Sequence, residues 1–157
     1  MRTIKFKGKC LKNGKWVYGS LVNTPFGTRI EWYEGCGGES FCEGEQVISA
    51  TVCQFTGFRD KDGYEIYEGD VLRSDKYPFC DVNYFGIVFY YAEKAKFRFV
   101  TVKNPQVSIV ASWDGIYDDL TQKKLRDFEV VGNIHEDEWK YYREYLQTKE
   151  EKAAEYD

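Results

Sequence analysis

Acidic side chains concentrate in one short stretch of the chain, at positions 60, 62, 65, 68 and 70. Paired carboxylates can bind calcium or act as a general acid and base. A calcium loop needs oxygen ligands at regular alternate positions, usually between helices, whereas Asp60-x-Asp62-Gly63 is too short and lies between expected strands. An acid–base pair needs one carboxylate with a raised pKa in a cleft, which no pattern here indicates. Asp-Lys-Asp-Gly is turn chemistry, so we favour a structural role for Asp60 and Asp62.

Histidine and cysteine offer little further chemistry. The chain has one histidine, His135, and five cysteines without a C-x-x-C pair. Cys36, Cys42, Cys53 and His135 could supply four zinc ligands, but their spacing matches no standard zinc module. There is no G-x-S-x-G motif, and His135 alone would have to activate any nucleophile, so it is expected to close the last strand or begin a helix. We therefore predict no catalytic residue, no metal and no cofactor, with the thiols reduced.

The charges are distributed unevenly along the chain. The net charge is −4, but the first twenty residues contain six basic side chains and no acid, whereas residues 136–157 are acidic. The favoured interpretation is that the two ends are solvated or attract each other. The alternative is a contact for nucleic-acid phosphates made by the six basic residues: Arg2, Lys5, Lys7, Lys9, Lys12 and Lys15.

The elements that would position these side chains are mainly β-strands. A length of 157 residues fits one domain or two very small ones, and an aromatic content of 18% favours pleated sheets. Asn13-Gly14 is a strong signal for a tight hairpin turn, and a further hairpin is expected around residues 92–96. The expected strands cover about residues 4–7, 16–18, 28–33, 46–55 with an irregularity near 49–50, 71–73, 86–91, 97–102, 107–112 and 128–131.

The C-terminal part differs from the rest. Trp139, Tyr142 and Leu146 follow the spacing of one helical face and predict a helix over about residues 136–147, with Asp137 as its cap. This face can pack on the protein's own β domain or on a neighbouring subunit. A polar tail, 148–157, follows and is expected to fray.

Three ordered segments resemble the YopX family of phage and prophage proteins. The segment 56–71 fits the pattern T-G-x-x-D-x-x-G-x-x-I-Y-E-G-D-[IV], the start of the chain resembles the family's opening hairpin, and residues 130–136 resemble its V-G-N-I-[YH]-E ending. The motif residues, to which we assign structural roles in turns, are Thr56, Gly57, Asp60, Gly63, Ile66, Tyr67, Glu68, Gly69, Asp70, Gly132 and Asn133.

The resemblance implies a mainly β protein, a β-rich pseudo-barrel with one C-terminal α-helix, and Glu68-Gly69-Asp70 before a strand suggests SH3-like barrel character. The expected domain covers 1–147, with a hairpin region to about 55, a barrel-like part over about 56–135 and then the helix. Family members have no assigned reaction and are suspected to oligomerise. We therefore expect a cytoplasmic, phage- or prophage-encoded binding module that is non-catalytic and homo-oligomeric, with a host or phage protein as partner and no membrane association. Nucleic-acid binding through the basic hairpin is the alternative.

Overall fold

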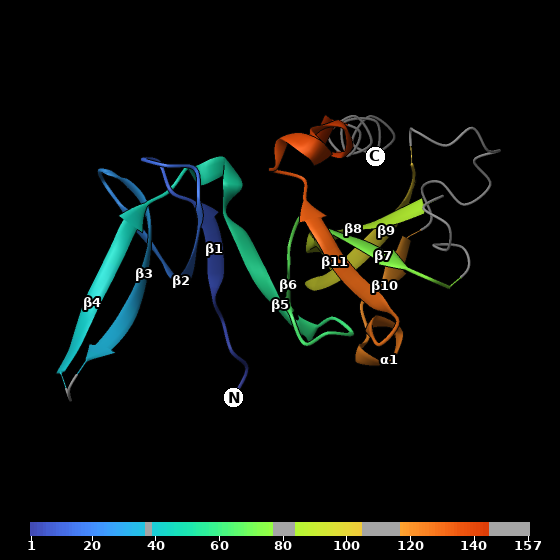
Figure 1. Ribbon diagram of the computed structural model, residues 1–157, viewed down its shortest axis with the longest axis horizontal. Coiled ribbons are helices and arrows are strands. Elements are labelled where there is room, and N and C mark those ends of the chain that lie inside the picture. Colours follow the sequence, from blue (N-terminus) through green and yellow to red (C-terminus); the bar gives the residue numbers. More distant parts are fainter. Residues whose placement is uncertain (37–38, 77–83, 105–116, 145–157) are drawn as a thin grey trace. The chain divides into compact units, whose positions relative to one another are not determined.

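The structure, a computed structural model, describes residues 1–36, 39–76, 84–104 and 117–144. The chain forms two compact units, an N-terminal unit of Met1–Gly57 and a C-terminal unit of Phe58–Asp157. Both consist mainly of antiparallel strands, so the predicted mainly β class is confirmed (Figure 1). No helix among the described residues is long and apolar enough to cross a membrane.

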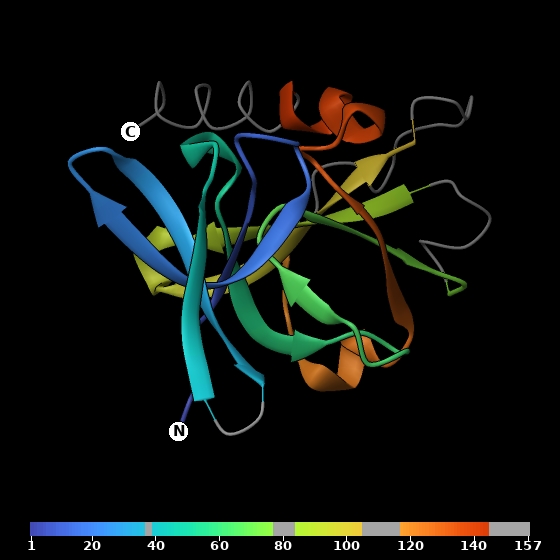
Figure 2. The same ribbon diagram turned by 60° about the vertical axis from the view of Figure 1, so that its left-hand side comes forward.

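The N-terminal unit contains a sheet with the strand order β4-β3-β2-β1-β5 (Figure 1). Asn13 and Gly14 form the expected turn between the first two strands: the Asn13 side-chain oxygen accepts a hydrogen bond from the Lys15 backbone N–H, and Gly14 has a φ of +68°. Figure 2 shows the two successive hairpins that follow. The elements are β1 (Phe6–Lys9), β2 (Trp16–Thr24), β3 (Gly27–Cys36), β4 (Glu39–Gln46), η1 (Ser49–Thr51) and β5 (Cys53–Arg59), of which β5 runs into the second unit.

A small core holds the N-terminal unit together. Its buried apolar residues include Cys10, Ile30, Val47 and Phe55. An isolated bridge pairs Cys10 with Val47, which brings the end of β1 to the end of β4 and curves the sheet. A Cβ atom at Gly8 would lie only 3.1 Å from the Val47 side chain, so this glycine allows the close approach.

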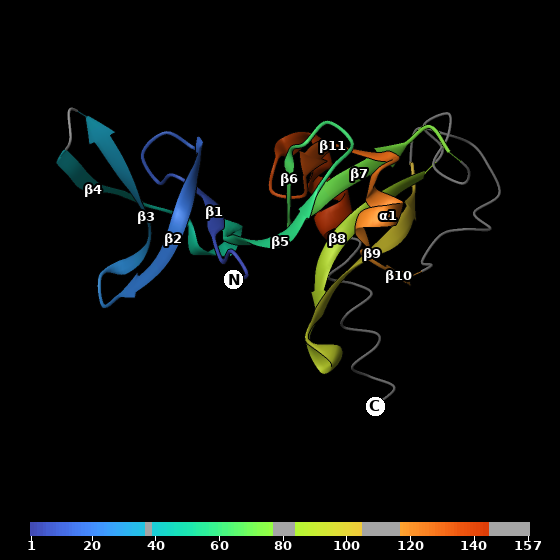
Figure 3. The ribbon, with the colours of Figure 1, turned by 90° about the horizontal axis from the view of Figure 1, so that it is seen from below.

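The C-terminal unit contains a five-stranded sheet with the order β10-β9-β8-β7-β11. Strand β6 is not part of this sheet; it pairs with β5, at the edge of the sheet described above. Figure 3 shows the β8–β9 hairpin, which η3 closes. The elements are β6 (Glu65–Tyr67), β7 (Asp70–Ser74), β8 (Tyr84–Tyr91), η3 (Ala92–Lys94), β9 (Lys96–Lys103), β10 (Tyr117–Asp119), α1 (Gln122–Leu125), β11 (Phe128–Asn133) and η4 (Asp137–Trp139).

Side chains from both faces of this sheet are buried. Alternate residues of β8 and β9 enter two separate apolar clusters, which is why these strands have almost continuous apolar sequences. One cluster includes Leu125 of α1 and Phe128 of β11, and the other includes Trp139 and Tyr142 near the C-terminus. The fold therefore covers the sheet with a helical segment on each face.

Several expected boundaries differ from the structure. The predicted helix starts as the 3-10 turn η4, and residues 140–144 are helical; positions 145–147, with Leu146, and the tail 148–157 lie outside the described residues. The prediction of Asp137 as the cap was wrong, because Glu136 occupies the cap position and makes no side-chain cap bond. The expected strand 107–112 also lies outside the described residues, whereas β4, β6, β10 and α1 were not predicted.

Candidate functional site

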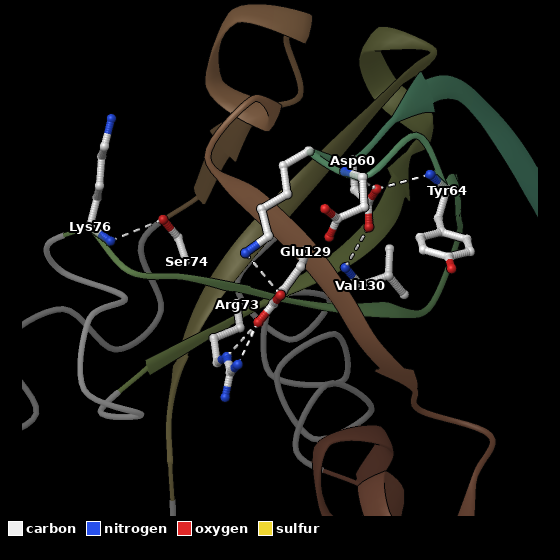
Figure 4. A network of polar contacts seen from close by, with 9 residues as sticks. Asp60, Tyr64, Arg73, Ser74, Lys76, Glu129 and Val130 are labelled. Carbon is white, nitrogen blue, oxygen red and sulfur yellow. Dashed lines mark hydrogen bonds and ion pairs between the residues drawn. The ribbon is translucent and has the colours of Figure 1, made fainter.

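Asp60 holds the first motif turn. Its side chain is 6% exposed, and one carboxylate oxygen accepts hydrogen bonds at 2.9 Å from the backbone N–H groups of Asp62 and Tyr64. The other oxygen accepts the Val130 N–H at 3.0 Å, which ties the turn to β11 (Figure 4). Gly63 completes the turn with a φ of +87°. The Asp60 carboxylate is thus occupied by three backbone donors, which suits a structural role.

Asp70 and Asn133 form a buried pair between the start of β7 and the end of β11. Asp70 is 0% exposed and accepts hydrogen bonds from the Tyr67 N–H at 2.7 Å and from the Asn133 side-chain amide at 2.9 Å. The same amide donates to the Glu68 carbonyl at 3.1 Å, and the Asn133 side-chain oxygen accepts the His135 N–H at 3.0 Å. Two distant motif segments are therefore joined by one network of polar contacts.

Most of the remaining motif residues are either buried side chains or glycines with positive φ. Ile66 and Tyr67 are buried, and the Tyr67 hydroxyl donates to the Glu65 carboxylate at 2.8 Å. Gly57 and Gly69 have φ values of +89° and +75°, which L side chains rarely adopt. Thr56 is buried as well.

Gly132 makes room for the indole ring of Trp139. A Cβ atom at Gly132 would lie 2.0 Å from the indole nitrogen, and the ring packs against the edge of Phe85 and stacks on Tyr142. Trp139 and Tyr142 are 9% and 3% exposed. Of the two alternatives, packing on the protein's own β domain or on a neighbouring subunit, these two side chains therefore follow the first and pack on their own unit. A charged residue at Trp139 is therefore expected to unfold the unit rather than to release soluble monomers.

Glu129 links the two motif segments through charge. Its carboxylate lies 2.9 Å from the Lys61 ammonium and accepts a hydrogen bond at 2.9 Å from the Arg73 guanidinium (Figure 4). The hydrogen bond from Lys61, followed by that from Arg73, lowers the pKa of Glu129, and Glu129 in turn raises the pKa of Lys61. The sequence analysis missed this cluster. Only the register of the two strands would have revealed it, because Glu129 and Arg73 are direct partners between β11 and β7.

The described cysteines and acids form no metal site. Cys10 and Cys53 are buried and Cys42 is exposed, each as a free thiol, while the Cys36 side chain lies outside the described part. Within the described ranges, no group of three or more His, Cys, Asp or Glu side chains is placed to bind a metal ion.

The basic residues of β1 and the residue just before it, Lys5, contact aromatic rings of their own unit. The Lys7 ammonium lies 4.8 Å from the centre of the Trp16 ring, and that of Lys9 lies 5.6 Å from the same ring. Lys5 lies 5.4 Å from the centre of the Phe55 ring. Since Lys7 is only 7% exposed, these cations do not form one open row for phosphates.

The other three basic residues, Arg2, Lys12 and Lys15, make no such ring contact within the described part of the chain. The Lys12 ammonium forms an ion pair with Glu45 of β4 at 3.1 Å. Four of the six predicted basic residues thus contact a ring or a carboxylate of their own unit, while Arg2 and Lys15 are exposed.

Strands β2 and β3 separate in the middle of the N-terminal unit. Their pairing runs from Thr24 opposite Gly27 to Ser20 opposite Glu31. A Cβ atom at the next residue, Gly19, would lie 2.1 Å from the Glu31 carbonyl oxygen, so only glycine fits where the strands approach closely and then part.

An open hollow of about 240 Å³ lies beyond this point. Its lining consists of Val17, Tyr18, Trp32 and Glu34. The Trp32 indole N–H donates a hydrogen bond to the Glu34 carboxylate at 3.1 Å, which fixes the ring beside the charge. We name this site the β2–β3 hollow. The sequence analysis did not single out Trp32 or Glu34, because residues 20–46 match no motif and the hollow arises only where two strands part.

The fold and its sites define a class of protein with two small antiparallel β units. Motif carboxylates hold turns in the second unit, and an aromatic and acidic hollow lies on the first. The sequence profile described as YopX protein matches residues 5–138, and the chain belongs to the YopX family. No curated protein matches the chain. A crystal structure of protein EF1440 from Enterococcus faecalis is similar, with 20% identity, a TM-score of 0.49, and coverage of 87% of this chain and 96% of that chain.

Proposed function

We propose that this YopX-family protein is a phage- or prophage-encoded, non-catalytic protein-binding module that self-associates and works in the cytoplasm of a bacterial host. The observation that carries this proposal is the exposure of three aromatic side chains on β2, β3 and the turn between them. Tyr18 is 50% exposed, Phe26 87% and Tyr33 79%. Aromatic residues are enriched at protein interfaces, where they bury much area at little entropic cost.

The polar residues support binding rather than catalysis. Asp60 and Asp70, the most buried motif carboxylates, accept hydrogen bonds from backbone and amide donors. A catalytic acid or base needs a carboxyl that faces a substrate in a cleft. These motif carboxylates therefore support the fold, and the exposed aromatic residues of the N-terminal unit are the proposed binding surface.

Opposite charges within the N-terminal unit favour self-association. Residues 1–20 contain six basic side chains and no acid, whereas residues 27–46 contain five glutamates and one arginine. Two copies can bring the basic part of one against the acidic part of the other. Such complementarity raises the rate of encounter and selects orientation.

The test combines self-association and partner capture with the full chain. Sedimentation velocity over a wide concentration series should show a rising average mass. Capture from bacterial lysate, with and without nuclease, should retain a host protein after nuclease, and the double variant Phe26→Ser, Tyr33→Ser should lose it. A control with Tyr64→Ser, an exposed tyrosine of the C-terminal unit, should retain it. A monomer that captures nothing from the lysate would refute the proposal.

Nucleic-acid binding is the alternative function. It predicts retardation of DNA or RNA at low salt that weakens as lysines of the first twenty residues are changed to Gln. Because Lys7 is buried and Lys12 is paired with Glu45, we expect no retardation. Retardation that Lys9→Gln and Lys15→Gln together abolish would replace the protein-binding proposal.

A further inference from the structure

We propose that the β2–β3 hollow binds the Lys15 side chain of a second copy of this chain. The inference rests on the proposed function, because it names the contact through which the module associates with itself. Two observations support it: the chemistry of the hollow fits a lysine side chain, and the turn that carries Lys15 is exposed and closed by the Asn13 side chain.

The size of the hollow suits a single side chain. Sites for drug-sized ligands and cofactors usually have volumes of about 300–1,000 Å³ and enclose most of the ligand. The hollow has about 240 Å³ and is open on one side. It is therefore too small and too open for a cofactor, but it can accept one long side chain from another protein.

The lining of the hollow matches a cation on an alkyl chain. Trp32 and Tyr18 contribute aromatic rings, Val17 contributes an apolar surface, and among the described lining residues Glu34 is the only charged one. Rings attract ammonium groups through their π faces, while the methylene groups of lysine pack on apolar surface. The Trp32 hydrogen bond to Glu34 keeps the carboxylate in place, so little ordering is needed on binding.

The surroundings of the hollow strengthen its attraction for cations. Glu43 is the partner of Trp32 in the β3–β4 ladder and is exposed. Glu31, next to Trp32 in the sequence, forms an ion pair with Arg29 at 3.5 Å and so has its charge partly balanced. The excess negative charge next to the hollow therefore comes from Glu34 and Glu43.

The turn between β1 and β2 provides the complementary part. All residues at positions 11–15 are exposed, and the turn is fixed by the Asn13 side chain and by Gly14. Within one chain, Lys12 of this turn already pairs with a β4 carboxylate, that of Glu45. The Lys15 ammonium has no partner among the described residues, so it is available to a second copy.

Charge reversal tests this contact in the full chain. Sedimentation velocity should show that Glu34→Lys and Lys15→Glu each weaken self-association at least tenfold, because each places like charges at the contact. An equimolar mixture of the two variants should associate again, because each hollow then meets a turn of opposite charge. The control Glu138→Lys changes the net charge by the same amount at an exposed position in the other unit and should behave as wild type.

Glu34→Gln is a milder variant that keeps the hydrogen bond from Trp32 within reach, and it should also weaken association if the fold is intact by circular dichroism. If the wild type self-associates and the variants do so equally well, the inference about Lys15 is overturned, while the proposal of self-association stands. A wild-type chain that stays monomeric at every concentration would overturn both the inference and the self-association on which it rests.

Discussion

Replacing Asn133 by Ala should destabilise the C-terminal unit strongly. The change removes two hydrogen bonds that the side-chain amide donates, to the Asp70 carboxylate and the Glu68 carbonyl, and one that it accepts from the His135 N–H. Asp70 is 0% exposed and Asn133 1%, so water does not readily replace these contacts. The charge-assisted bond contributes about 1.5–3 kcal/mol and each neutral bond about 1 kcal/mol. The expected loss is therefore roughly 3–5 kcal/mol.

Differential scanning calorimetry provides the measurement. A loss of this size in a unit of about 100 residues corresponds to a fall in Tm of at least roughly 12 °C. Asn13→Ala is the matched control, because it removes one exposed turn bond to the Lys15 N–H and should cost less than about 1 kcal/mol. If Asn133→Ala lowered Tm no more than Asn13→Ala, the buried pair would not hold the two motif segments together.

Asn133→Asp tests the charge of the pair separately from its shape. The substitution keeps the size of the side chain but places a second carboxylate beside that of Asp70, in a site without solvent. Like charges raise the pKa of one carboxyl in the folded state above its unfolded value. The variant should therefore lose stability at neutral pH and regain part of it as the pH falls through that raised pKa. A loss of stability relative to the wild type that does not change with pH would contradict this explanation.

Two further predictions concern the neighbouring contacts. Gly132→Ala should destabilise the protein by about 1–3 kcal/mol and alter the near-UV circular dichroism, because its Cβ atom would lie 2.0 Å from the Trp139 indole nitrogen; an unchanged spectrum and Tm would contradict the packing. Glu129→Gln should lower stability at neutral pH, since Lys61 and Arg73 depress the pKa of Glu129 and so stabilise the fold above the unfolded pKa of the carboxyl. That contribution is lost as the pH falls through the depressed pKa. In urea unfolding, the free energy of unfolding of the variant should therefore be lower than that of the wild type at pH 7, and the difference should disappear in acid. An equal difference at both pH values would exclude the ion pairs as its cause.

Local signals in the sequence predicted the parts of the fold that depend on neighbouring residues. Segments rich in aromatic and β-branched residues predicted the hairpin of β8 and β9, and Asn13-Gly14 predicted the first turn; both are confirmed. The strand β4 was missed because its sequence, ESFCEGEQ, has no alternation of apolar residues, and pairing with β3 determines its conformation. The short helix α1 is held by Thr121 at its start and by burial of Leu125, which a four-residue segment does not reveal alone.

The candidate sites divide in the same way. Asp60 was assigned to a turn from its local sequence, and the structure places its carboxylate on the N–H groups of that turn. The ion pairs of Glu129 and the β2–β3 hollow depend on strand register and on the point where two strands part, and neither is a local property of the chain. Long-range pairing is the information that residue spacing does not contain.

The position of the motif relative to the accessible surface bears on how function is distributed in this family. The motif side chains Asp60, Asp70 and Asn133 are buried and engaged with backbone groups of the C-terminal unit, so they define a fold and leave no group for a ligand. Trp32 and Glu34 of the β2–β3 hollow lie outside the three segments that resemble the family. A protein can therefore contain the complete motif without Trp32 or Glu34, and it would keep the fold while losing the proposed binding of Lys15. Specificity in such proteins is to be sought on the strands β2 to β4 rather than in the motif that identifies them.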